Sequence, residues 1–259
     1  MSNKVILISI DGMRADGLMN CGNEYLEILK DTSSYTFDAK TVFPSITLPC
    51  HLSLFHSVPP ERHGTLNNDY STPVRPVSGL FEQVKSAGKS ACMFYGWHPL
   101  RDVCRSGSLM AAEYLNAYAA EHTDGILTDK ALKYIKEYSP DFVFLYMVET
   151  DEKGGHDNGW MSETYLEYIS HAINNVKRVI EAVGEEYTVI VTADHGGHDR
   201  GHGSDSFEDM TIPMVFHGKE FEAKKELHNV SILDLAPTIA DIMGLVKPRE
   251  WEGKSLVKG

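Results

Sequence analysis

The chain has 259 residues, of which 42% are hydrophobic and 24% charged, a composition typical of a globular protein and not of a disordered or low-complexity one. It carries 37 acidic against 24 basic residues, a formal net charge of −13, and contains no block rich in Lys and Arg. Such a chain is not expected to bind a nucleic-acid polymer or an anionic membrane through a basic face. The acidic excess accompanies 12 histidines, and carboxylate and imidazole are both ligands of divalent metals.

Continuous apolar runs are typical of strands buried on both faces of a parallel sheet, and five occur, at residues 4–12, 90–95, 141–148, 187–193 and 212–216. Helical patterns lie between them, at residues 79–87, 128–138, 161–183 and 231–243. Strands alternating with helices predict an α/β fold, with a mostly parallel central sheet and helices on both faces. We expect one domain over residues 1–259, in which irregular loops at about 59–76 and 96–121 could cover a site.

The cysteines lie far apart and form no CxxC pair, which argues against a disulfide framework or a thiolate zinc site; they are Cys21, Cys50, Cys92 and Cys104. The apolar run from Val5 to Ile10 is too short for a signal peptide. No segment approaches the roughly 20 apolar residues that span a bilayer. We therefore expect a cytoplasmic protein with reduced thiols, and the sequence does not indicate its oligomeric state.

Three predicted strands end in ionisable residues, namely Asp11, the segment 149–151, and Asp194 with His195. Sites in open α/β sheets form at the carboxyl ends of strands, so these side chains are expected to meet at one edge. Taken alone, Asp11 with Gly12 is more typical of an ordinary turn. The convergence of the three segments is what predicts a site.

The densest candidate is the glycine-rich segment 193–203, in which Asp194 and three histidines fall within nine residues: His195, His198 and His202. An isolated Asp-His pair is more often part of a solvated loop, but this density favours a site for zinc or manganese. The segment 149–156 again combines acids, glycines and a histidine. Alone it could be a turn at a helix start, whereas beside the first segment it would supply ligands for a second ion.

Thr47 lies next to the expected start of a helix that runs toward Phe55. Its hydroxyl could be an N-cap. A hydroxyl there also lies where backbone N–H groups and the helix dipole favour an anion, and a bound dication would lower its pKa and make it a nucleophile. The two roles are compatible.

Six motifs in chain order resemble the alkaline phosphatase superfamily, and within it the type I phosphodiesterase/nucleotide pyrophosphatase branch. They are ISIDGMRAD (8–16), FPSITLPCH (43–51), VPPERHG (58–64), DHGGHDRGHG (194–203), DLAPTIADIMGL (234–245) and WEGKSL (251–256). The resemblance spans nearly the whole chain. It implies two divalent ions, zinc or alternatively manganese, that are bridged by the phosphoryl group being transferred.

The resemblance also implies site residues. Around the metal that activates the nucleophile it implies Asp11, Thr47, Asp194 and His195, and around the metal that stabilises the leaving group it implies Asp151, His156 and His202. Asn68 matches an asparagine that hydrogen-bonds a non-bridging phosphoryl oxygen. His198 matches no ligand and is expected to be a hydrogen-bond donor behind the ligands or a substrate contact.

One spacing departs from the family pattern. Relatives place the ligand His four residues after the Asp, whereas Asp151 and His156 are five apart, with an additional glycine. Either the chain bulges at Gly154 and Gly155, or Glu152 replaces Asp151. We favour Asp151, because it follows the strand and a glycine pair can absorb one extra residue.

The implied enzyme is a two-metal phosphohydrolase that cleaves small phosphodiester or nucleotide-pyrophosphate esters through a phosphothreonine intermediate at Thr47. The alternatives are a phosphomonoesterase or phosphonate hydrolase on the same metal core, and a non-catalytic metal- or anion-binding module. A formylglycine sulfatase is disfavoured because the chain has TLPCH (47–51) where C/S-x-P/A-x-R is needed, and a phosphoglycerate mutase because there is no room for its inserted domain.

Substrate contacts could come from Tyr95, Trp97, Arg101 and Arg105, although the two aromatic residues could equally belong to the core.

Overall fold

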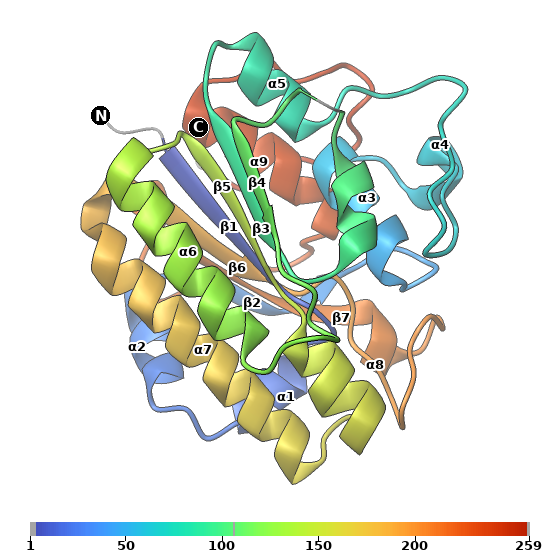
Figure 1. The fold of residues 1–259 in the computed structure, drawn as a ribbon, viewed down its shortest axis with the longest axis vertical. Coiled ribbons are helices and arrows are strands. Elements are labelled where there is room, and N and C mark those ends of the chain that lie inside the picture. The colour runs from blue at the N-terminus through green and yellow to red at the C-terminus, as the bar shows by residue number, and fades with distance from the viewer. Residues whose placement is uncertain (1–3, 106, 258–259) are drawn as a thin grey trace.

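In the computed structural model, which describes residues 4–105 and 107–257, the described strands form one sheet through the middle of the molecule (Figure 1). The strand order is β4-β3-β5-β1-β6-β7-β2-β8. The strands are β1 (Lys4–Ile10), β2 (Ser34–Lys40), β3 (Ala91–Tyr95), β4 (Ala111–Tyr114), β5 (Phe142–Met147), β6 (Tyr187–Thr192), β7 (Thr211–His217) and β8 (Lys225–Glu226). The pairings of β7 with β6 and β2 are antiparallel and the others are parallel, so the predicted mostly parallel α/β sheet is confirmed.

Helices cover both faces of the sheet, as the sequence predicts. They are α1 (Ala15–Asn20), α2 (Tyr25–Thr32), α3 (Thr47–His56), α4 (Pro60–His63), α5 (Leu80–Ser86), α6 (Thr123–Tyr138), α7 (Glu163–Val183), α8 (Phe207–Met210) and α9 (Leu235–Met243), with the 3-10 segments η1 (His98–Val103), η3 (Gly184–Glu186) and η4 (Ile232–Asp234) and the π-helix η2 (Thr150–His156). On one face, α7 packs against α1, α2 and α6, and on the other α9 packs against α3 and α5 (Figure 1).

Strand β1 lies between β5 and β6, parallel to both. The segment Val5 to Ile8 is at most 1% exposed, which explains why β1 has an unbroken apolar sequence instead of an alternating one. The strand thereby carries Asp11, its next residue, to the middle of the carboxyl edge of the sheet.

Three strands were not predicted: β4 at one edge of the sheet, and β2 with β8 at the other. The buried residues of strand β2 are the small Ser34, Thr36 and Ala39, and its pairing with β7 shifts register between Thr36 and Ala39, so no apolar run marks it. The expected irregular loop at 96–121 is wrong in part, because it contains η1 and the edge strand β4. The helix expected at 128–138 begins earlier, at Thr123.

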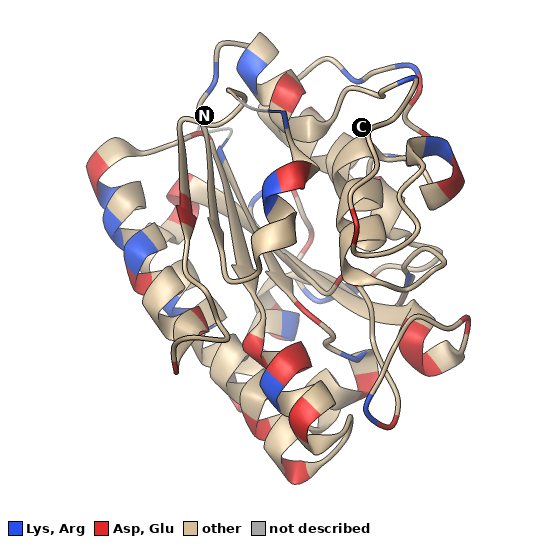
Figure 2. Ribbon diagram, turned by 45° about the vertical axis from the view of Figure 1, so that its right-hand side comes forward, with Lys and Arg blue, Asp and Glu red and all other residues tan. Residues whose placement is uncertain are grey.

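Charged residues of both signs are interspersed along the outer helices (Figure 2). The acidic excess is thus spread over the described surface. No helix within residues 4–105 and 107–257 is both long enough and apolar enough to cross a membrane.

The first prediction concerns the central strand. Replacing Leu7, which is completely buried, by Ala is expected to lower the free energy of unfolding by about 2–5 kcal/mol, because it removes apolar contacts and leaves a cavity. Replacing Val246, which is 80% exposed, by Ala should change it by less than about 0.5 kcal/mol. Urea unfolding followed by circular dichroism measures both, and equal stabilities of the two variants would contradict this account of the core.

Candidate active site

Three buried carboxylates meet at the carboxyl edge of three adjacent strands, β5, β1 and β6. Asp11 directly follows β1, Asp151 is the second residue of η2 after β5, and Asp194 lies two residues beyond β6. Their exposed fractions are 2%, 5% and 0%. The expected convergence of the three strand ends is therefore seen in the structure.

The first group of possible metal ligands consists of Asp11, Asp194 and His195, whose ligand atoms lie within 4.8 Å of one another. His195 Nε2 is 3.3 Å from Asp11 Oδ1 and 3.4 Å from Asp194 Oδ2. Thr47 Oγ1 lies 3.2 Å from the same nitrogen. The structure thus brings together the four residues expected around the nucleophile.

Helix α3 directs the Thr47 hydroxyl into this group. Ile46 is the extended N-cap residue and Thr47 is the first residue of the helix, so the interpretation of Thr47 as an N-cap is wrong. No helix backbone N–H engages its hydroxyl, which faces His195 instead. Asn68 lies beside it, since its Oδ1 accepts a hydrogen bond from the Leu48 N–H at 3.1 Å.

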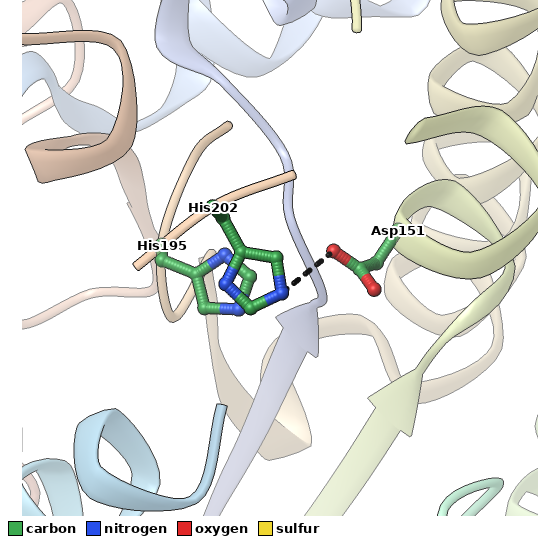
Figure 3. A group of neighbouring side chains, drawn as sticks. All are labelled: Asp151, His195 and His202. Atoms are coloured by element: carbon green, nitrogen blue, oxygen red, sulfur yellow. Dashed lines mark ion pairs between the residues drawn. The ribbon is translucent and has the colours of Figure 1, made fainter. Parts of the chain in front are cut away.

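The second group consists of Asp151, His195 and His202 (Figure 3). The rings of His195 and His202 are stacked, with centroids 3.9 Å apart, and His202 Nε2 faces Asp151 Oδ1 at 3.9 Å. His156 Nε2 lies 3.3 Å from the other carboxylate oxygen of Asp151. The three residues expected around the second metal are therefore also neighbours, and His195 belongs to both groups.

The π-helix η2 accommodates the extra residue between Asp151 and His156. A π-helix closes i to i+5 hydrogen bonds, so residues five apart lie on the same face of its wide turn. The Glu152 side chain points elsewhere and accepts a hydrogen bond from the Tyr118 hydroxyl at 3.2 Å. A Cβ at Gly155 would lie 2.5 Å from the ring of Trp160, so close packing requires glycine there.

One oxygen of each buried carboxylate is left without a hydrogen bond. Asp11 Oδ1, Asp151 Oδ1 and Asp194 Oδ2 have no hydrogen-bond partner among the described residues. Burial raises the pKa of Asp194 to about 7, and burial together with the charges of Asp194 and Asp151 raises the pKa of Asp11 well above its usual range. Burial also opposes ionisation of Asp151. This effect is outweighed by the hydrogen bond between Asp151 and His156 and by the nearby imidazoles, which together lower the pKa of Asp151. Unpaired carboxylate oxygens among imidazole nitrogens fit divalent cations.

Backbone carbonyls hold the three imidazoles in place. The Nδ1 atoms of His195, His202 and His156 lie 2.8, 2.9 and 3.0 Å from the carbonyl oxygens of Gly196, Ser45 and Arg200, respectively. An Nδ1–H that donates to a carbonyl leaves Nε2 as the metal-binding atom, and each Nε2 faces the carboxylates.

Two further residues lie against the carboxylates and were not singled out from the sequence. The Tyr146 hydroxyl, in β5, donates to Asp11 Oδ2. His51 is fully buried in α3, where its Nδ1 lies 2.8 Å from the Thr47 carbonyl and 3.4 Å from Asp194 Oδ2. A tyrosine inside an apolar strand gives no signal, but His51 ends the motif at 43–51.

Some expected contributors have other partners. Tyr95 is buried in β3 against Tyr114, which favours its interpretation as a core residue, and Trp97 packs against the core. Arg101 pairs with neighbouring side chains of η1. His198 is hydrogen-bonded to Asp209 at 2.7 Å and not to any expected ligand.

These features define a class of protein. Its members have an α/β fold in which buried carboxylates and imidazoles lie beside a hydroxyl at the start of a helix, as in an enzyme active site. Residues 5–211 match the family described as type I phosphodiesterase / nucleotide pyrophosphatase. The chain belongs to this family.

Curated relatives include phosphopentomutase of Alkaliphilus metalliredigens, 26% identical over 64% of this chain and 40% of the relative. Ectonucleotide pyrophosphatase/phosphodiesterase family member 1 of Rattus norvegicus is 25% identical over 75% of this chain and 24% of the relative. The chain thus spans less than half the length of these relatives.

Solved structures share the fold. Human ectonucleotide pyrophosphatase/phosphodiesterase 5 superposes with a TM-score of 0.83 at 14% identity, covering 97% of both chains. An inactive variant of the murine protein in complex with AMP gives 0.82 at 15% identity, covering 95% of this chain and 96% of the other. The phosphonate monoester hydrolase of Silicibacter pomeroyi gives 0.76 at 14% identity, covering 98% and 75%.

The second prediction tests the packing of η2. Replacing Gly155 by Ala should destabilise the protein by about 1–3 kcal/mol, because the new methyl group would overlap the Trp160 ring. The matched control is Gly125→Ala in α6, where a Cβ meets nothing within 4 Å and helix propensity should make the change neutral or stabilising by up to about 1 kcal/mol. Thermal unfolding compares them, and a Gly155→Ala variant as stable as Gly125→Ala would refute this packing.

Proposed function

We propose that the protein is a two-metal phosphohydrolase that cleaves small phosphodiester or nucleotide-pyrophosphate esters through a phosphothreonine intermediate at Thr47. The observation that carries the proposal is the position of the Thr47 hydroxyl, 3.2 Å from His195 Nε2 and in front of buried carboxylates with unpaired oxygens. A module that only binds metal or anions would not need a hydroxyl there.

Two cations would be held by the two sets of residues that the family resemblance implies. Asp11, Thr47, Asp194 and His195 would hold one, and Asp151, His156 and His202 the other. Such cations lower the pKa of a hydroxyl, draw charge from phosphoryl oxygens and stabilise the leaving oxygen. Zinc suits this mixture of imidazole and carboxylate, and manganese is the alternative.

The chain's own residues then carry out two displacements. Thr47 gives its hydroxyl proton to solvent, Oγ1 forms a bond to phosphorus, and the bond to the leaving oxygen breaks, which takes up a proton from solvent to leave as an alcohol or a nucleotide. Water next attacks phosphorus from the vacated side and releases a proton to solvent, the bond between phosphorus and Oγ1 breaks, and Oγ1 takes up a proton, which regenerates the Thr47 hydroxyl. The Asn68 side-chain amide N–H group makes no hydrogen bond with a described residue and would donate to a non-bridging phosphoryl oxygen.

A small substrate agrees with the charge of the chain. With a net charge of −13, the surface repels long polyanions, whereas cations at the centre would attract a single phosphate ester. Two names among the comparisons point the same way, since one relative is a nucleotide pyrophosphatase and one solved structure of the same fold is a complex with AMP.

The third prediction concerns the nucleophile. Thr47→Ala should reduce kcat for bis-p-nitrophenyl phosphate in the presence of zinc by at least about 1,000-fold, whereas Thr47→Ser should retain measurable turnover. Ser53→Ala is the matched control, because this buried hydroxyl lies in the same helix but bonds His63. Unchanged turnover in Thr47→Ala would refute the covalent mechanism, and a wild type that hydrolyses only p-nitrophenyl phosphate would favour the monoesterase alternative.

The fourth prediction concerns the metal. Zinc at about 100 times its dissociation constant should stabilise the chelator-treated protein by about 2.7 kcal/mol, seen as a rise in melting temperature. Asp194→Asn should remove much of this gain. Asp141→Asn should retain it, because Asp141 precedes β5 at the opposite edge of the sheet and accepts hydrogen bonds from Ser90. A melting temperature that zinc leaves unchanged in the wild type would contradict the assignment.

A further inference from the structure

The segment 196–204, called the histidine loop below, orients two of the imidazoles. His198 and Gly201 exchange backbone hydrogen bonds of 2.9 Å, which closes a tight turn. The carbonyl of Arg200, at the tip of this turn, lies 3.0 Å from His156 Nδ1, and His202 belongs to the loop itself. The position of the histidine loop therefore sets the direction of His156 and of His202.

One buried residue, Asp209 in α8, ties this loop at three points. Its carbonyl oxygen accepts a hydrogen bond from the Gly196 N–H at 2.8 Å. Its Oδ1 lies 2.7 Å from His198 Nδ1, and its Oδ2 accepts from both the N–H and the hydroxyl of Ser204 at 2.8 Å. These ties lie on both sides of His202, although Asp209 contacts neither His202 nor His156.

Asp209 and His198 each favour the charged form of the other. The hydrogen bond and charge of Asp209 raise the pKa of His198, and although burial opposes ionisation of Asp209, His198 and Ser204 lower its pKa. An asparagine has the same shape but only one accepting oxygen, so it cannot accept from both His198 and Ser204.

We propose that Asp209 is a positioning residue for the second cation, the one assigned to Asp151, His156 and His202. Its carboxylate holds the histidine loop in place, and the loop in turn sets the directions of His202 and His156. This inference rests on the proposed function. If Asp209 had a purely structural role, its replacement would lower stability and affect the affinities for both cations equally. If it is a positioning residue, its replacement weakens binding of the second cation more than binding of the first.

The test is a titration of zinc alone into metal-free protein, followed by calorimetry. The wild type should bind two ions. Asp209→Asn should weaken the affinity for the second ion by at least tenfold and keep the affinity for the first within threefold. The kcat of this variant for bis-p-nitrophenyl phosphate should be low at limiting zinc and recover in excess zinc. The matched control is Asp234→Asn, another buried carboxylate that accepts from backbone N–H groups, those of Ser231 and Lys254, and it should keep both affinities within threefold.

A milder variant keeps the test decisive if Asp209→Asn does not fold. Ser204→Ala removes only the hydroxyl donor and retains the backbone N–H, so it should weaken the second ion by three- to tenfold. If the wild type binds two zinc ions and neither folded variant changes the second affinity by more than threefold, the inference is wrong and the proposed function stands. If the wild type binds no second ion, both are wrong.

Discussion

The burial of three carboxylates beside one another is the constraint on which the rest of the site depends. Asp11, Asp151 and Asp194 are brought together because β5, β1 and β6 are neighbours in one parallel sheet. Burial of three acids in one place is unfavourable without positive charge, and the raised pKa values of Asp11 and Asp194 express that cost. Two divalent cations would remove it. The arrangement is thus easier to explain as a metal centre than as part of a core.

Around this centre, the polar contacts fix side-chain direction. Tyr146 holds one oxygen of Asp11, and backbone carbonyls fix the ring orientation of the three histidines. Each of these contacts limits where a ligand atom can point. The π-helical turn of η2 and the histidine loop serve the same purpose, because they adjust the backbone where a regular helix or hairpin would misplace an imidazole.

Much of this could be predicted from the sequence, because its strongest signals lie at the centre of the sheet. Unbroken apolar runs reveal β1, β5 and β6, and each run is followed by the polar residues that the structure brings together. The edge strand β4, four residues long with half-exposed side chains, offers no such signal. Helix α6 was placed too late, since Asp124 and Gly125 resemble a turn, whereas the Asp124 carboxylate accepts from the backbone N–H groups of Val148 and Glu149.

Other features depend on contacts between distant segments. The sequence shows that Asp151 and His156 are one residue too far apart, but the π-helix becomes evident only with Trp160 packed against Gly155. The pairing of His198 with Asp209 joins residues eleven apart through a loop without apolar periodicity. Such tertiary contacts cannot be read from local patterns.

Diffraction from zinc-grown crystals at the zinc absorption edge would test the central claim most directly. The account predicts two anomalous peaks, one bounded by Asp11, Asp194 and His195 beside Thr47, and the other by Asp151, His156 and His202. Crystals in which zinc binds elsewhere on the chain while this cluster shows no anomalous peak would contradict it.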